Sequence, residues 1–378
     1  MKTVELVFFD AGGGHRSAAN ALCEIARLEQ RPWTMPMTNL LELFADLDFW
    51  RRLTGIGLGE VYNGMLRRGW TLGAPALLRA MHAVVRLYHQ AQVTLLVQHW
   101  QRNRPDLVVS FIPHFNRALY EAIQRVMPEV QLVTILTDLA DYPPHFWIEE
   151  HQRQYFVCGT DLAQEQARNA GHPAERVFQT SGMILNPRFY APVAPRQASD
   201  VTALGLDPAL PTAVMVFGGE GSAAMCTIAR VLDASDLDVQ LIAVCGKNAN
   251  LEASLRAAPR RLPMYVTGFT PDVARLMLLS DFFIGKAGPG SISEAVAMGL
   301  PVIIERNHWT MPQERYNATW VAERGFGITV RSFRRDIVEA TREMLDPRRR
   351  RHFVEAVRAS QNRAVFEIPT ILERIMSA

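Results

Sequence analysis

Three glycine-rich turns hold most of the residues in this sequence that could do chemistry. Their sequences are DAGGGHRSAA at 10–19, FGGEGSAA at 217–224 and GKAGPGSISEAVAMGLP at 285–301. Glycine lets the backbone approach a ligand closely, and the free N–H groups at the start of a following helix favour phosphate oxygens. One such turn could serve packing alone. Three turns, divided between the two halves of the chain, indicate a phosphate-bearing ligand in an interdomain cleft.

The spacing within these turns disfavours two common nucleotide-binding classes. None of them ends in Gly-Lys-Ser/Thr, and none has the full G-x-G-x-x-G spacing in the context typical of a nicotinamide cofactor. Kinase and dehydrogenase interpretations therefore rank low.

His15 and Asp138 are the candidates for proton transfer. His15 ends the first turn, and imidazole has an unperturbed pKa near neutrality, which suits a general base. The alternative is a histidine that caps the following helix or contacts phosphate. Asp138, in Thr-Asp-Leu at a strand end, could orient or supplement that base, and it could equally cap the next segment.

The elements that must position these turns follow from the hydrophobic pattern. Short β-branched runs bounded by Gly, Pro or Asp alternate with stretches of helical period, which is typical of a parallel sheet covered by helices. We predict two doubly wound α/β domains, in which a ligand binds beyond the carboxyl ends of the strands. Strands are predicted at 4–9, 107–112, 132–137 and 155–158, and then at 213–217, 239–245, 264–266, 282–285 and 302–305.

A chain of 378 residues is long enough for two domains, and an aperiodic stretch with three prolines at 186–200 divides it. We predict an N-terminal domain over 1–188, a linker over 189–200, a C-terminal domain over 201–352 and a helical tail over 353–378. The tail is expected to break near Pro369 and to pack back on the N-terminal domain.

The composition is that of a soluble globular protein, with 48% hydrophobic and 21% charged residues. The net charge of +2 gives no overall case for nucleic-acid binding. The 4 cysteines are far apart and lack zinc-ligand spacing, which favours a reducing cytosol. No apolar stretch has the length that a membrane-spanning helix needs.

Several motifs together resemble one known family. They are GGGH with Ala18 and Ala19, GGEG at 218–221, CGKN at 245–248, Gly-Phe at 268–269 and above all KAGPGSISEA at 286–295. In order and spacing they resemble the monogalactosyldiacylglycerol synthase and processive diacylglycerol glucosyltransferase family, and more distantly the peptidoglycan GlcNAc transferase. The resemblance implies a GT-B fold, in which two facing Rossmann-like domains enclose an interdomain cleft. It also implies a UDP-sugar donor on the C-terminal domain, an acceptor on the N-terminal domain and inversion at the anomeric carbon.

The resemblance also implies roles for residues at matching positions. Glu294 would hold the ribose hydroxyls of UDP, although SISE at 291–294 could instead form a capping box at a helix start. Backbone groups around Gly268 and Phe269 would read the uracil edge, unless Phe269 merely packs at a strand end. The residues expected to bind UDP are Gly14, Gly219, Glu220, Gly221, Ser222, Gly268, Phe269, Gly288, Pro289, Gly290, Ser291 and Glu294. The residues expected to bind the sugar are Gln313, Glu314 and Asn317. These three could instead form an exposed helix start without a ligand.

The reaction that these residues imply needs no cofactor beyond the UDP-sugar substrate. Backbone amides near 219–222 and 288–291 can stabilise negative charge on the departing diphosphate without a metal. Two Asp-x-Asp triplets, at 46–48 and 236–238, lie in polar connections and are interpreted as solvated loop carboxylates. We therefore expect no metal site.

The segment from 49 to 104 departs most from the average composition. It holds eight arginines and one acid, so its local charge is about +7, with tryptophans among the arginines. A basic amphipathic helix with interfacial aromatic residues suits an anionic membrane surface, and the alternative is a packed helix with a solvated basic face. No groove-reading motif supports nucleic acid. The expected membrane or acceptor contacts are Arg67, Arg68, Trp70, Arg79 and Arg86.

Departures from the family pattern lie in the acceptor-facing half. Tyr142-Pro143-Pro144 replaces the usual His-Pro, and Ile184 and Asn186 stand where the family has Pro and Arg. The element around Ser110 and His114 matches only loosely. The sequence therefore predicts the donor side more firmly than the acceptor, and diacylglycerol is one choice among lipids.

The sequence thus predicts an inverting glycosyltransferase that moves a hexose from a UDP-sugar to a lipid acceptor at the cytoplasmic membrane face. It would be peripheral on the inner face of the cell membrane. A UDP-sugar epimerase of similar fold and a non-catalytic UDP-sugar-binding subunit are the alternatives.

Overall fold

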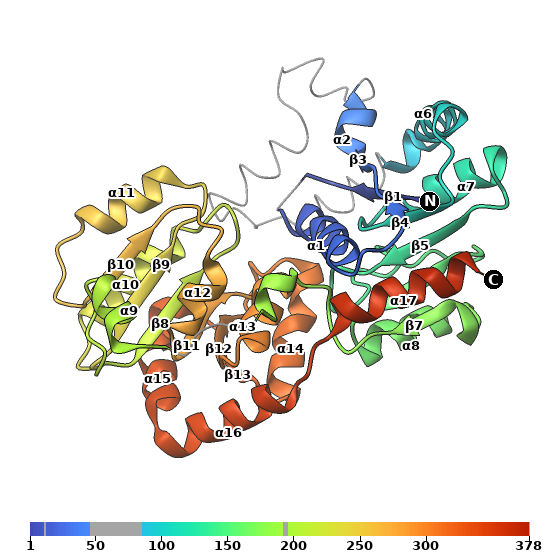
Figure 1. Ribbon diagram of the computed structural model, residues 1–378. Coiled ribbons are helices and arrows are strands. Elements are labelled where there is room, and N and C mark those ends of the chain that lie inside the picture. Colours follow the sequence, from blue (N-terminus) through green and yellow to red (C-terminus); the bar gives the residue numbers. More distant parts are fainter. Residues whose placement is uncertain (11–12, 46–84, 192–195, 378) are drawn as a thin grey trace. The chain divides into compact units, whose positions relative to one another are not determined.

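The computed structural model describes residues 1–10, 13–45, 85–191 and 196–377. They divide into two compact units, each built on its own sheet (Figure 1). Of the described residues, the first unit contains those up to Pro187 together with Asn362 and the residues that follow it, and the second contains Arg188–Gln361. Arg86 is the one residue of the expected membrane set that falls within the described ranges.

The first unit has a seven-stranded sheet in which every pairing is parallel. Its order is β2-β1-β4-β5-β6-β7, and β3 also pairs with β1. The strands are β1 (Lys2–Phe8), β2 (Trp33–Thr34), β3 (Met37–Asn39), β4 (Leu107–Ser110), β5 (Gln131–Ile135), β6 (Tyr155–Cys158) and β7 (Val177–Gln179). The helices are α1 (Gly14–Leu28), α2 (Leu40–Leu43), α6 (His89–Arg102), α7 (Asn116–Val126), α8 (Asp161–Asn169), η2 (Ala174–Arg176) and α17 (Ala364–Met376), with η3 (Pro187–Phe189) at the boundary.

The second unit has a six-stranded parallel sheet of order β10-β9-β8-β11-β12-β13. Its strands are β8 (Thr212–Val216), β9 (Gln240–Val244), β10 (Met264–Thr267), β11 (Phe282–Lys286), β12 (Val302–Glu305) and β13 (Gly327–Val330). Its helices are α9 (Ala198–Ala203), α10 (Ala224–Asp233), α11 (Ala249–Ala257), α12 (Val273–Leu278), α13 (Pro289–Ala297), η4 (Pro312–Glu314), α14 (Arg315–Glu323), α15 (Phe333–Leu345) and α16 (Pro347–Ala359).

This strand order fixes where a ligand would bind in the second unit. The chain runs outward from β8 to β10 and then returns to β11 on the other side of β8. In doubly wound sheets, a ligand binds beyond the carboxyl ends of the strands at such a reversal of strand order, which here falls between β8 and β11. The two glycine-rich turns of this unit follow those same two strands.

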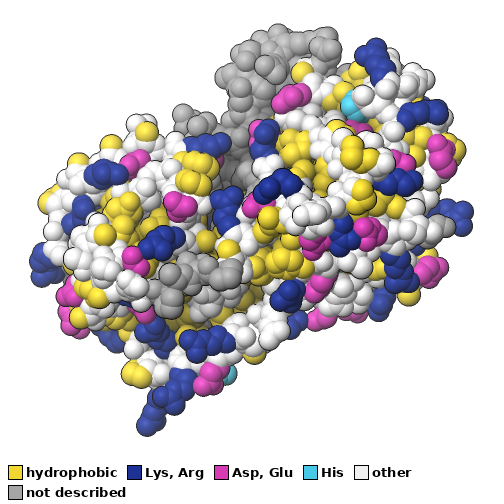
Figure 2. Space-filling model, viewed as in Figure 1, with side chains coloured by type: hydrophobic (Ala, Val, Ile, Leu, Met, Phe, Trp, Pro, Cys, Tyr) yellow, Lys and Arg dark blue, Asp and Glu magenta, His cyan; other side chains and the backbone are white. Residues whose placement is uncertain are grey.

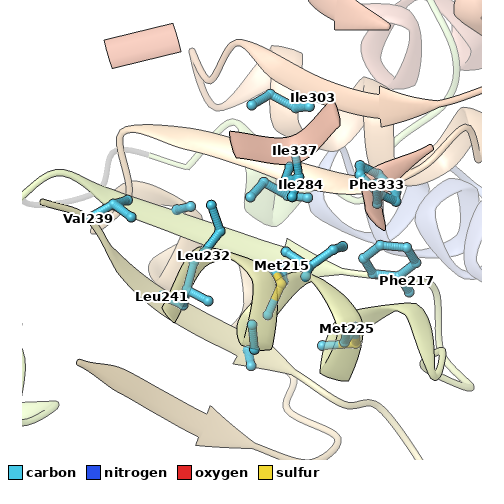
Figure 3. Packing of buried hydrophobic residues seen from close by; sticks show 14 of the residues in the cluster. Met215, Phe217, Met225, Leu232, Val239, Leu241, Ile284, Ile303, Phe333 and Ile337 are labelled. Atoms are coloured by element: carbon cyan, nitrogen blue, oxygen red, sulfur yellow. The ribbon is translucent and has the colours of Figure 1, made fainter. Parts of the chain in front are cut away.

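The core of the second unit explains why its strands read as continuous apolar runs. All five residues of β8 and of β9 are buried, as expected for a sheet covered on both faces. Figure 3 shows Met215 and Ile284 of neighbouring strands packed with Leu232 of α10 and with Ile337 and Phe333 of α15. The glycine turns thus extend from a sheet whose strands are buried in a packed apolar core.

The helical tail differs from its prediction at two points, and the first is that residues 353–361 of the predicted tail belong to the second unit. The second is that the break lies between Ala359 and Ala364, where α16 ends and α17 begins, and not at Pro369, which is inside α17. Pro369 is buried within α17, so the apolar contact of its ring offsets the missing backbone donor. Helix α17, red in Figure 1, packs beside α1 within the first unit.

Candidate functional site

His15 lies in the first turn of α1, immediately beyond the carboxyl end of β1. Gly13 precedes the helix with φ 81°, a left-handed conformation that favours glycine and turns the chain from strand to helix. The Nδ1 atom of His15 lies 3.0 Å from the hydroxyl oxygen of Thr137, which follows β5. The sheet therefore brings together two groups that are 122 residues apart.

Burial sets the protonation state of this histidine. Desolvation lowers the pKa of His15 to about 4, and a backbone hydrogen bond with Phe111 acts in the opposite direction. The imidazole is therefore neutral at physiological pH. A neutral imidazole can accept a proton, whereas a protonated one cannot.

Asp138 is 8% exposed, and its Oδ2 accepts a hydrogen bond of 2.8 Å from the indole N–H of Trp147. The Trp147 ring lies 5.9 Å from the His15 ring, measured between centroids. One indole thus contacts both residues predicted to act in proton transfer. The structure brings His15 and Asp138 to the same edge of the first sheet.

Asp141, which the sequence did not reveal, holds the loop that carries Trp147. Its carboxylate accepts hydrogen bonds from the backbone N–H of His145 at 3.0 Å and of Trp147 at 2.6 Å. Burial raises the pKa of Asp141 to about 6, and these backbone bonds partly offset that rise. The side-chain amide of Gln166 bonds both the N–H and the carbonyl of Asp141. These contacts fix the position of the indole.

In the second unit, the turns after β8 and β9 are packed against each other. Gly246 has φ 60°, and a Cβ atom there would lie 2.2 Å from the carbonyl oxygen of Gly219. The backbone N–H of Lys247 donates to that same carbonyl at 2.8 Å, and Asn248 donates to the carbonyl of Glu220 at 3.3 Å. Gly219 is exposed, and an added Cβ would meet nothing within 4 Å. The turn over 218–222 is therefore held in place while its backbone stays open.

The turn after β11 leads directly into α13, which begins at Pro289 and makes no side-chain capping bond. This start excludes the capping box considered for Ser291 and Glu294, because Glu294 then lies in the second turn of the helix. Burial raises the pKa of Glu294 to about 7, and Arg188 partly offsets the rise. Gly288, Pro289, Gly290 and Ser291 form the junction between β11 and α13, where free N–H groups gather.

The predicted sugar-binding residues converge on this junction from η4 and α14. Asn317 is fully buried, and its Nδ2 donates to the carbonyl of Ala287 at 2.7 Å. Glu314 accepts a 2.6 Å hydrogen bond from the ammonium of Lys286, the last residue of β11. The buried Oε1 of Gln313 and the buried Oδ1 of Asn317 have no hydrogen-bond partner within the part of the chain that the structure describes. A ligand with hydroxyl donors would satisfy both atoms.

The side chain of Phe269, just beyond β10, is 67% exposed. The alternative of a phenylalanine packed at a strand end is therefore wrong. A Cβ atom at Gly268 would lie 2.5 Å from Glu252 Oε2, the end of a flexible side chain that can move aside, so this position does not require glycine.

The remaining predictions are tested only in part. Arg86 is exposed, while Arg67, Arg68, Trp70 and Arg79, like the triplet at 46–48, lie outside the described residues. Asp236, in the other triplet, pairs with Arg342 at 2.8 Å. Among the described residues, no group of three or more His, Cys, Asp or Glu side chains could hold a metal ion, and no helix is long and apolar enough to cross a membrane. Basic and acidic side chains are interspersed over the face shown in Figure 2.

The sequence and fold were compared with known proteins. Residues 213–371 match the glycosyltransferase family 28 C-terminal domain. A probable monogalactosyldiacylglycerol synthase 2 of Oryza sativa subsp. japonica is 28% identical over 97% of this chain and 79% of its own length. This similarity confirms the resemblance that the motifs indicate.

Solved structures share the fold. MurG of Acinetobacter baumannii superposes with a TM-score of 0.64 at 13% identity, over 99% of this chain and 100% of its own. A UDP-N-acetylglucosamine 2-epimerase superposes with a TM-score of 0.57 at 14% identity, over 96% and 91%. The chain has two Rossmann-like units of the GT-B type, as predicted. Because a transferase and an epimerase both have this fold, the fold alone does not decide between these activities.

Proposed function

We propose, starting from the glycosyltransferase family 28 domain at residues 213–371, that this protein transfers a hexose from a UDP-sugar to a lipid acceptor. The acceptor is diacylglycerol-like, the reaction inverts the anomeric carbon and needs no metal, and the protein works peripherally at the cytoplasmic membrane face. In this proposal the first unit holds the acceptor and the second unit holds the donor.

One observation carries the proposal: two glycine turns and the buried amides of Gln313 and Asn317 gather where the strand order of the second sheet reverses. Both amides have an oxygen without a partner among the described residues, and the Asn317 amide is bonded to Ala287 in the turn after β11. A turn with free N–H groups suits a diphosphate, and buried unpaired acceptors suit sugar hydroxyls. A UDP-sugar presents both kinds of group.

The proposed mechanism assigns each step to this chain's residues. Backbone N–H groups at the start of α13 and in the turn over 218–222 stabilise charge on the departing diphosphate. Glu294 accepts hydrogen bonds from the ribose, and Phe269 lies at the uracil. The neutral imidazole of His15 takes the proton of the acceptor hydroxyl, while Asp138, fixed by Trp147, orients or supplements that base.

Incubation with radiolabelled UDP-glucose, UDP-galactose and UDP-GlcNAc, together with vesicles that contain diacylglycerol, tests the proposal. We expect label to enter the lipid phase, with or without EDTA. Loss of transfer in EDTA, restored by a divalent cation, would contradict the metal-independent mechanism.

An epimerase remains the second candidate, because a UDP-N-acetylglucosamine 2-epimerase shares the fold. The same incubation discriminates between them. An epimerised, free sugar nucleotide with no labelled lipid would establish the epimerase. Binding without turnover of any of the three donors would indicate a non-catalytic UDP-sugar-binding subunit.

A further inference from the structure

Lys286 is a charged residue of the second unit that the predicted donor site did not include. The chain has only three lysines, Lys2, Lys247 and Lys286, among 40 basic residues. Lys247 and Lys286 both follow or end strands at the carboxyl edge of the second sheet, after β9 and in β11. Lysine is a compact point charge with three donors, which suits phosphate oxygens whose position shifts during a reaction.

The Lys286 side chain runs along both glycine turns at the point where the strand order reverses. A Cβ atom at Gly218, after β8, would lie 3.6 Å from Lys286 Cε, and one at Gly288, after β11, would lie 2.9 Å from it. The backbone of Gly288 is extended, with φ −75°, a conformation that any residue can adopt. The space beside Gly288 is therefore occupied by the lysine chain, which places the ammonium beside the free N–H groups of α13.

The ammonium is 2.6 Å from Glu314 Oε1. The Lys286 side chain is 38% exposed and that of Glu314 is 13% exposed. The lysine end of this ion pair is open to solvent, so a ligand can reach the ammonium from that side. A diphosphate carries more negative charge than one carboxylate and would compete effectively for the same ammonium.

We infer that Lys286 binds the diphosphate of the donor and that its ion pair with Glu314 opens when the donor binds. Lys286 then contacts phosphate, and the released Glu314 carboxylate accepts hydrogen bonds from the sugar hydroxyls, next to Gln313 and Asn317. Diphosphate binding thereby prepares the sugar site. The inference rests on the proposed function, because it requires a nucleoside diphosphate sugar as the ligand.

The two residues give opposite expectations for UDP, which lacks the hexose that the donor transfers. Loss of the Lys286 ammonium removes a charge-assisted hydrogen bond to phosphate, so Lys286→Met should bind UDP about tenfold or more weakly than the wild type. Glu314→Gln removes the carboxylate that competes for the ammonium, so this variant should bind UDP several-fold more tightly than the wild type. The ratio of its affinity for the UDP-sugar to its affinity for UDP should fall. A Glu314 that merely supports the fold would instead weaken UDP binding when replaced.

Titration calorimetry of the full chain with UDP and the UDP-sugar, and ligand-observed NMR with uridine, test this exchange. Uridine lacks phosphate, so its binding should be the same in wild type and Lys286→Met, which also shows that the variant is folded. In the double variant, the gain from Glu314→Gln should disappear. Lys2→Met, which removes an ion pair with Asp106, and Glu339→Gln, which removes one with Arg342, are matched controls.

The outcomes separate the inference from the proposed function. A wild type that binds neither UDP nor the UDP-sugar would overturn the proposed function. A wild type that binds UDP, with equal affinity in Lys286→Met, would overturn the role of Lys286 alone. Weaker UDP binding in Glu314→Gln would overturn the exchange of partners.

Discussion

His15 and Glu294 are half-buried titratable groups whose pKa values move in opposite directions for one reason. Burial disfavours charge, so it lowers the pKa of His15 to about 4 and raises that of Glu294 to about 7. Both side chains are thus held near their neutral forms without a ligand. In the proposed reaction one of them must gain a proton and the other must lose one, so pH dependence can report on each separately.

Uridine affinity should rise with pH through about 7 if Glu294 holds the ribose. The carboxyl group keeps its proton up to about pH 7, and only the carboxylate accepts hydrogen bonds from both ribose hydroxyls. Binding would then release a proton below that pH, so affinity increases as pH rises from about 5 to 8 and levels off above. Ligand-observed NMR with uridine avoids the titration of phosphate groups. Glu294→Gln should show a flat profile, and an unchanged slope in that variant would refute the assignment.

Replacement of His15 should affect turnover and spare donor binding. We expect His15→Ala to lower kcat for label transfer by about 10²- to 10⁴-fold, the usual contribution of a general base, with UDP affinity unchanged. His151→Ala is the matched control, because that side chain is 95% exposed in the same unit. A His15→Ala variant that loses UDP affinity and keeps kcat would instead identify a diphosphate contact.

At the scale of elements, the sequence predicts most of the strands and misses β2, β3, β7 and β13. The predicted runs at 155–158 and 302–305 coincide with β6 and β12. Strands β2 and β3 have 2 and 3 residues, too few for a period to show, and β13 begins with glycine. Their places are set by pairing with β1 and β12, a long-range effect that local pattern does not contain.

The candidate site follows the same rule. The glycine turns and His15 are visible in the sequence, because a turn needs glycine locally. The Thr137 contact with His15, the Trp147 bond to Asp138 and the Lys286 pair with Glu314 join distant segments. No spacing rule predicts such contacts, and the place of Lys286 at the start of the motif KAGPGSISEA does not by itself assign it a role.

Helix α17 supports the element that carries His15. It packs beside α1 and buries Val365, Ile368 and Leu372, each 1% exposed or less. Leu372→Ala should therefore lower the free energy of unfolding by about 2 to 4 kcal/mol, as for other buried leucines. Urea denaturation measures this loss. The exposed Thr370→Ala on the same helix should change it by less than about 0.5 kcal/mol, and equal losses would contradict the packing role.

At the scale of the whole molecule, chemistry is distributed between two units with separate sheets. The first contributes a neutral histidine and an aspartate held by Trp147. The second contributes glycine turns, the ion pair of Lys286 with Glu314, and two amides whose oxygens lack a partner among the described residues. Neither set alone could both activate an acceptor and hold a donor. A lipid acceptor adds one requirement, which is that the protein reach a membrane surface.

The arginines between 49 and 104 provide the test of that requirement. Arg86 is exposed and precedes Leu87, whose side chain is 80% exposed, an arrangement of charge and apolar surface that suits a lipid interface. Replacing Arg67, Arg68, Arg79 and Arg86 with Gln should abolish sedimentation with vesicles that contain anionic lipid. Wild-type binding should weaken as salt is raised, because the attraction to the surface is screened.

The control must remove the same charge elsewhere, so that a general loss of positive charge is not mistaken for a local contact. Arg334, Arg335, Arg348 and Arg351 are exposed in the second unit, and their replacement with Gln removes four positive charges as well. We expect this control to bind vesicles like the wild type. If both quadruple variants lose binding equally, attraction depends on net charge alone. If neither does, the basic segment is a solvated face, and the lipid acceptor must be reached in another way.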